Sequence, residues 1–137
     1  PSGRNSRIVM FRYEVNPPVS SEDLNHLFAE SWPKHESTDF DKILERALIY
    51  ICAYHDAELI GFAKLISDGG VHAFLLDPTV TPTFRRQGHA KEMVKCLKVE
   101  AKSHGLEWIH VDYEPHLKSF YEACGFNPTE AGVCKLR

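Results

Sequence analysis

The sequence lacks every cysteine and histidine spacing that commonly holds a metal ion. Its four cysteines, at positions 52, 96, 124 and 134, form no C-x-x-C pair, and its eight histidines include no H-E-x-x-H. Zinc ribbons and thioredoxin-type redox sites therefore have no support. We expect no metal, and we expect reduced and mostly buried thiols in a cytoplasmic protein.

Long apolar runs and an excess of positive charge are also missing. No stretch approaches the roughly 18–20 consecutive apolar residues of a membrane span, and no charged start followed by an apolar run indicates a signal peptide. The 16 basic residues are outnumbered by 19 acidic ones, and the formal net charge is −3. A broad nucleic-acid surface would need a basic face. We therefore expect no membrane partner and no nucleic-acid partner.

The remaining composition fits one domain, since 43% of the 137 residues are hydrophobic. We expect residues 1–7 to form a polar, disordered leader and residues 8–137 to form the single domain. Alternation and caps predict the order β-α-α-β-β-β-α-β-α-β, an α/β (α+β) fold with a mixed, mostly antiparallel sheet flanked by helices. The expected strands are 8–15, 47–55, 58–67, 71–80, 106–113 and 133–136, and the expected helices are 20–32, 40–47, 88–104 and 115–124.

Two details of this pattern carry further expectations. Pro78 is unsuited to a fully paired central strand, so it predicts a bulge or an end of pairing. An exposed terminal strand at 133–136 would allow two chains to pair as a homodimer.

The densest positive charge lies where the longest helix begins, in Arg85-Arg86-Gln87-Gly88. A helix start has unpaired backbone N–H groups and a positive dipole end, so it favours anions. Gly88 lets the backbone approach a ligand closely, and Ala90 keeps the next turn small. These features suit a pyrophosphate. The spacing is neither G-x-x-x-x-G-K-[ST] nor G-x-G-x-x-G, so an ordinary helix start with solvated arginines is the alternative.

A second motif follows downstream, in which Phe120-Tyr121 precedes Gly125-Phe126. With both motifs in this order, the sequence resembles the GNAT (N-acetyltransferase) superfamily. Residues 85–90 fit that family's R/Q-x-x-G-x-G/A signature, residues 80–82 its Val-x-Pro, and residues 120–126 its F-Y-x-x-x-G-F. The resemblance covers about residues 49–126.

The resemblance implies a transferase that moves an acetyl or other acyl group from acetyl-CoA to an amine of a small molecule or peptide. It implies that the backbone N–H of Val80 stabilises the oxyanion, and that Tyr121 stabilises or protonates the leaving thiolate. It also implies a pantetheine arm beside Val80 and a pyrophosphate on the backbone of residues 86–90. The implied cofactor-binding residues are Thr79, Val80, Arg85, Arg86, Gln87, Gly88, His89 and Ala90.

The general base and the acceptor site are less well marked. His72 is the candidate general base, because it lies on the strand that leads to Val80 and points to the same side as Val80 if no bulge intervenes. The alternative is that His72 is a structural histidine and that a water chain acts as the base. Trp32 and Glu114 are candidates for the acceptor site, and Glu114 stands where the family often has Asn. A non-catalytic acyl-CoA sensor and a nucleic-acid-binding domain that uses the arginine pair are the competing functions.

Overall fold

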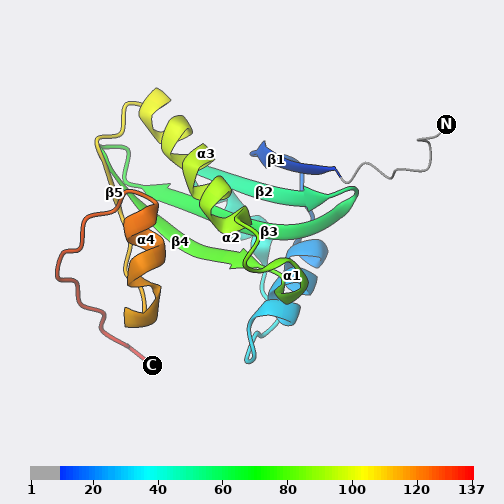
Figure 1. Cartoon of the computed structure of the whole chain (residues 1–137). Coiled ribbons are helices and arrows are strands. Elements are labelled where there is room, and N and C mark those ends of the chain that lie inside the picture. The colour runs from blue at the N-terminus through cyan, green and yellow to red at the C-terminus, as the bar shows by residue number, and fades with distance from the viewer. Residues whose placement is uncertain (1–9) are drawn as a thin grey trace.

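A five-stranded sheet runs through the computed structural model, which describes residues 10–137 (Figure 1). The strands lie side by side in chain order, antiparallel except for the parallel pair of β4 and β5. The expected leader 1–7 and the start of the first expected strand lie outside the described residues. The strands are β1 (Phe11–Val15), β2 (Ile49–His55), β3 (Glu58–Ser67), β4 (His72–Val80) and β5 (Trp108–His110).

One face of the sheet is covered by α1 (Ser21–Ser31) and α2 (Phe40–Arg46). Each helix begins where the sequence predicts, because Ser20 and Asp39 accept hydrogen bonds from backbone N–H groups of the first turn. The apolar side chains of these helices pack against Cys52 and Phe62 of the sheet. This smaller core fixes where α1 ends relative to the end of β4.

The other face is covered by α3 (His89–Ser103) and α4 (Lys118–Ala123), which lie next to each other in Figure 1. The buried stripe of α3 is the one that the spacing predicts, and it contains Met93, Val94, Leu97 and Ala101. Two short 3-10 helices, η2 (Pro82–Phe84) and η3 (Pro115–Leu117), precede α3 and α4. The mixed sheet flanked by helices confirms the expected fold class.

The bulge predicted at Pro78 is present in β4. Phe62 pairs with Thr79 but Lys64 pairs with Leu76, so one residue of β3 faces two residues of β4. Asp77 accommodates the extra residue with a φ of 54 degrees. The extra residue reverses the side-chain alternation, so Val80 faces α3 whereas His72 points to the opposite side. The expectation that these two residues share a side holds only if no bulge intervenes, so it does not apply here.

The last expected strand is also wrong, because residues 126–137 contain no strand. Val133 is 83% exposed and Leu136 is 88% exposed, so the segment buries too little apolar surface to offset the entropy of ordering a strand. The terminal strand through which we expected two chains to pair is thus absent. None of the helices within residues 10–137 has the length and hydropathy needed to cross a membrane.

Candidate active site

The sheet opens between β4 and β5 at the end of β4. The two strands pair only where residues 72–74 meet residues 108–110, and β4 then continues through residues 75–80 without a partner on that side. In Figure 1 the two strands separate in this direction, with α4 beside the opening. An unpaired strand edge presents backbone N–H and C=O groups that a ligand can use.

The backbone of Val80 faces this opening. The N–H of Thr81 donates to the carbonyl oxygen of Ile60 at 2.9 Å, a bond that flanks the pair of Gly61 and Val80. In an antiparallel ladder, a pair flanked in this way is a non-hydrogen-bonded pair, whose own N–H and C=O groups point away from the partner strand. The N–H of Val80 is therefore directed away from β3, into the opening.

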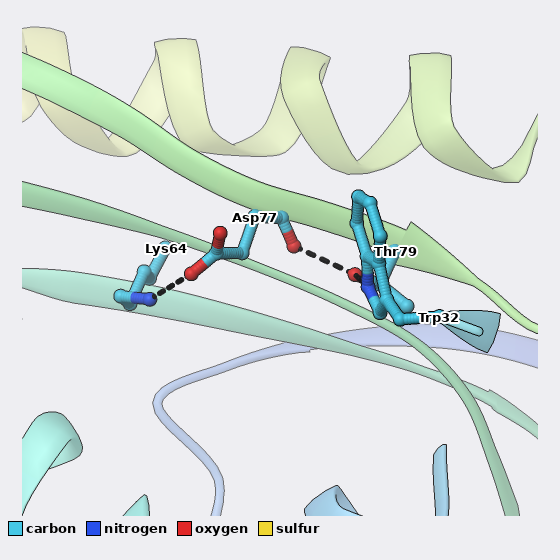
Figure 2. A network of polar contacts seen from close by, with 4 residues as sticks. All are labelled: Trp32, Lys64, Asp77 and Thr79. Atoms are coloured by element: carbon cyan, nitrogen blue, oxygen red, sulfur yellow. Dashed lines mark hydrogen bonds and ion pairs between the residues drawn. The ribbon is translucent and has the colours of Figure 1, made fainter. Parts of the chain in front are cut away.

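A polar network holds the bulge next to Val80 (Figure 2). The Nζ of Lys64, a buried side chain, donates to Asp77 Oδ2 at 2.7 Å. Thr79 Oγ1 donates to the carbonyl of Asp77 at 2.9 Å and accepts from Trp32 Nε1 at 3.1 Å. The network joins the end of α1 to the end of β4. It also brings Trp32, our candidate for the acceptor site, to the strand that ends in Val80.

The Lys64–Asp77 pair is a part of the site that we did not predict. A signal for it exists in the sequence, since Lys64 is the one charged residue inside the apolar stretch Leu59–Ile66. A buried lysine needs a carboxylate partner. Asp77 immediately precedes Pro78, and aspartate tolerates the left-handed conformation that a bulge can require.

The start of α3 forms an open seat for an anion. Gly88 is the N-cap with a φ of 87 degrees, and no side chain caps the first backbone N–H groups. A Cβ on Gly88 would meet no atom within 4 Å, so the space beside the Cα of this residue is open. Unpaired N–H groups and the positive helix end favour a phosphate here.

The side chains around this seat differ in their roles. Arg86 and Gln87 are exposed. Arg85 is bound to the protein, because its Nε donates to the carbonyl of Val80 at 2.9 Å and its Nη2 donates to the carbonyl of Ser31 at 3.1 Å. Arg85 thereby ties the loop to β4 and α1, so its side chain positions the seat in this structure.

His89 also turns inward. Its Nδ1 lies 2.6 Å from the hydroxyl of Tyr13, and its ring contacts Phe11 and Phe84. Burial lowers the pKa of His89, with a further contribution from the charge of His55. Only the backbone of His89 is therefore placed to contact a phosphate.

Tyr121 lies on the β5 side of the opening. Its ring stacks on Tyr113, just beyond β5, with the ring centroids 4.8 Å apart, and it belongs to the same buried cluster as Val80. Within residues 10–137 the Tyr121 hydroxyl has no hydrogen-bond partner. It is not among the fully buried side-chain polar atoms without a partner, a group in which the described residues have only His89 Nε2, so the hydroxyl reaches solvent. Burial, and secondarily Cys124 and Asp112, raise the pKa of Tyr121 to about 12. The phenol is thus protonated at neutral pH and can donate a hydrogen bond.

The other predicted residues are not all brought to this opening. His72 is eight positions from Val80 along β4, or about 26 Å at the rise of a strand, and its Nδ1 lies 2.8 Å from His110 Nε2. Glu114 is exposed at the start of η3, directly after Tyr113. Among the described residues, no three His, Cys, Asp or Glu side chains form a group that could hold a metal ion.

The sequence of this chain matches a known family. The model of the acetyltransferase (GNAT) family matches residues 20–126, which is most of the chain. The chain belongs to the GNAT family. The three motifs described above, at residues 80–82, 85–90 and 120–126, all lie within the matched residues.

Two curated relatives of this GNAT chain are informative. The chain is 31% identical over 78 residues to the uncharacterized N-acetyltransferase ycf52 of Pyropia yezoensis, covering 57% of this chain and 45% of the relative. It is 25% identical over 118 residues to GCN5-related N-acetyltransferase 1, chloroplastic, of Arabidopsis thaliana, covering 84% of this chain and 60% of the relative. The chain thus spans about half the length of the curated relatives it matches.

Solved structures share the fold. The aminoglycoside N-acetyltransferase AAC(6')-Iy in complex with CoA superimposes with a TM-score of 0.77 at 23% identity, covering 96% of this chain and 97% of that one. At this identity the likeness establishes the fold of the GNAT chain, and the chemistry must be argued from its own residues.

Proposed function

We propose that this chain is an N-acetyltransferase domain that transfers an acetyl group from acetyl-CoA to an amine. The observation that carries the proposal is the opening between β4 and β5. It has the N–H of Val80 directed into it from one side and the protonated phenol of Tyr121 at the other. The anion seat at Gly88 lies a short loop after Val80, so one extended thioester would reach both.

In the proposed reaction a neutral amine attacks the thioester carbonyl, a C–N bond forms and the C–S bond breaks. The N–H of Val80 stabilises the oxyanion. The phenol of Tyr121 donates a hydrogen bond to the departing sulfur. Since His72 lies about 26 Å from Val80 along the strand, we assign the proton that the amine releases to water and not to this histidine.

The pKa of Tyr121 defines its role more closely. A thiol ordinarily has a pKa of about 8.5, so complete transfer of a proton from a phenol with a pKa of about 12 costs about 5 kcal/mol. A thiolate in the same apolar surroundings is also made more basic, as burial raises the pKa of the neighbouring Cys124. We therefore assign Tyr121 as a hydrogen-bond donor that keeps its proton, while the sulfur leaves as a thiolate and is protonated by water.

The acceptor is placed by Trp32 on the α1 side of β4, with Glu114 near the β5 side. AAC(6')-Iy has been solved with a bisubstrate analogue, CoA-S-monomethyl-acetylneamine, which supports an amine as the class of acceptor. Whether this amine belongs to a small molecule or to a peptide stays a prediction, as do the cytoplasmic location and the homodimer.

The test is an amine panel of small polyamines, aminoglycosides and peptides, assayed with acetyl-CoA by detection of the released thiol. We expect thiol release that depends on both acetyl-CoA and an amine. Tight binding of acetyl-CoA by calorimetry without thiol release from any amine would favour the sensor instead. Strongly salt-dependent binding of nucleic acid, with no binding of acetyl-CoA, would favour the third function.

A further inference from the structure

A groove of about 310 Å³ runs between α3 and α4, starting at the anion seat. Gly88 lines one end of it. The α3 side is lined by Lys91, Lys95 and Lys98, and the α4 side by Ala123 and Cys124. Positions 88, 91, 95 and 98 are three or four residues apart, so they form one stripe of the helix surface. The groove therefore continues the phosphate seat along a basic helix face.

Most of the positive charge that lines this groove is not neutralised by a carboxylate of the described residues. Glu92 is the one acidic side chain that lines it. Lys98 donates to the carbonyl of Cys124 at 2.8 Å and thus joins the two helices. Among the ion pairs of the described residues, none involves Lys91 or Lys95. These two ammonium groups are therefore available to an anion that enters the groove.

Their spacing suits a ligand that already rests on Gly88. With a rise of 1.5 Å per residue, Lys91 lies about 4.5 Å and Lys95 about 10 Å from Gly88 along the helix axis. Lysine side chains are long and mobile, so both can reach the middle of the groove. A charged group one sugar unit beyond the pyrophosphate would lie between them.

We propose that Lys91 and Lys95 bind the 3′-phosphate of coenzyme A and so make the site selective for CoA over dephospho-CoA. This inference rests on the proposed function, which places the pyrophosphate at Gly88. The ribose follows the pyrophosphate in CoA, and its 3′-phosphate is the remaining charged group of the cofactor. A phosphate monoester carries a charge of about −1.5 to −2 at neutral pH, which two ammonium groups can match.

The experiment is a calorimetric titration of the whole chain with CoA and with dephospho-CoA. We expect the unmodified protein to bind CoA about tenfold or more tightly than dephospho-CoA, because hydrogen bonds to a charged group contribute this much to affinity. In the double variant Lys91→Gln/Lys95→Gln the two affinities should lie within about threefold of each other, because the loss falls on CoA alone. The variant Lys102→Gln is the matched control, since it removes the same charge from α3 at a position that does not line the groove.

Three results would overturn the inference. The first is equal affinity of the unmodified protein for CoA and dephospho-CoA. The second is a preference for CoA that survives in the double variant while thermal unfolding shows the variant to be folded. Binding of neither compound would overturn the inference together with the proposed function, whereas equal binding of both would leave that function intact. If the double variant fails to fold, the exposed Lys95→Gln alone should still lower the preference by about threefold or more.

Discussion

Removing the hydroxyl of Tyr121 tests the chemistry directly. Tyr121→Phe keeps the ring, and thus the stack on Tyr113 and the edge contacts with Phe120 and Phe126. No hydrogen bond is lost within the described residues, because the hydroxyl has no partner there. We therefore expect the free energy of unfolding to change by less than about 1 kcal/mol. The affinity for acetyl-CoA should also change little, since the bond to sulfur forms only as charge develops.

The size of the kinetic effect follows from the same assignment. A hydrogen bond to a charged group contributes about 1.5–3 kcal/mol, and each 1.4 kcal/mol corresponds to a factor of ten. The kcat of Tyr121→Phe should therefore fall by about 10- to 150-fold while KM for acetyl-CoA stays within about threefold. With a pKa of about 12, the phenol should also cause no loss of rate by ionisation at any pH below about 11.

The assay is thiol release with whichever amine of the panel is turned over, at saturating acetyl-CoA. Tyr113→Phe is the matched control, because it removes the same atom from the stacked neighbour, and its kcat should stay within about twofold of the unmodified value. An unchanged kcat for Tyr121→Phe would refute the reasoning. An equal loss in Tyr113→Phe would show that the pair matters as packing and not through the Tyr121 hydroxyl.

Three further predictions concern the frame of the site. Gly88→Glu should abolish acetyl-CoA binding in calorimetry, and Gly69→Glu is the control that should leave binding intact. Both variants put a side chain at a similar positive φ, so each should lose about 1–2 kcal/mol of stability. Asp77→Asn keeps a residue that tolerates the positive φ of this position but removes the charge that pairs with the buried Lys64, so it should lower the unfolding free energy in urea by about 1–2 kcal/mol, and adding Lys64→Met should restore most of it. Retained destabilisation in that double variant would contradict this account. The pKa of His89 is lowered in the folded protein, so the contribution of His89 to stability is present above about pH 6.5 and is lost as the pH falls through the lowered pKa. His89→Gln should therefore flatten the unfolding free energy, measured in urea, as a function of pH in this range. An unchanged pH profile would assign the loss of stability to other groups.

The parts of the fold that depend on local pattern could be predicted from the sequence. The caps of α1 and α2, the stripe of α3 and the bulge at Pro78 follow from residue types at fixed spacings. The anion seat at Gly88 and the phenol of Tyr121 were found in the same way, through short motifs. Their assignment to a cofactor is a proposal that binding experiments must decide.

The errors arose where the outcome depends on distant contacts. The orientation of His72 relative to Val80 depends on one extra residue of β4 opposite β3. Pro78 indicates a bulge or an end of pairing, but only the register with β3 shows that one residue is added and the side reversed. The strand expected at 133–136 has suitable residues but no surface that would bury Val133 and Leu136. The Lys64–Asp77 pair joins two strands through the same bulge, so the sequence signals a buried lysine but does not name its partner.

The most direct measurement is a crystal structure of the chain with acetyl-CoA bound. The account predicts a pyrophosphate on the backbone N–H groups at Gly88 and a thioester carbonyl oxygen about 2.7–3.2 Å from the backbone nitrogen of Val80. It also predicts the sulfur next to the hydroxyl of Tyr121. A cofactor bound elsewhere, or one whose thioester lies outside the opening between β4 and β5, would contradict it.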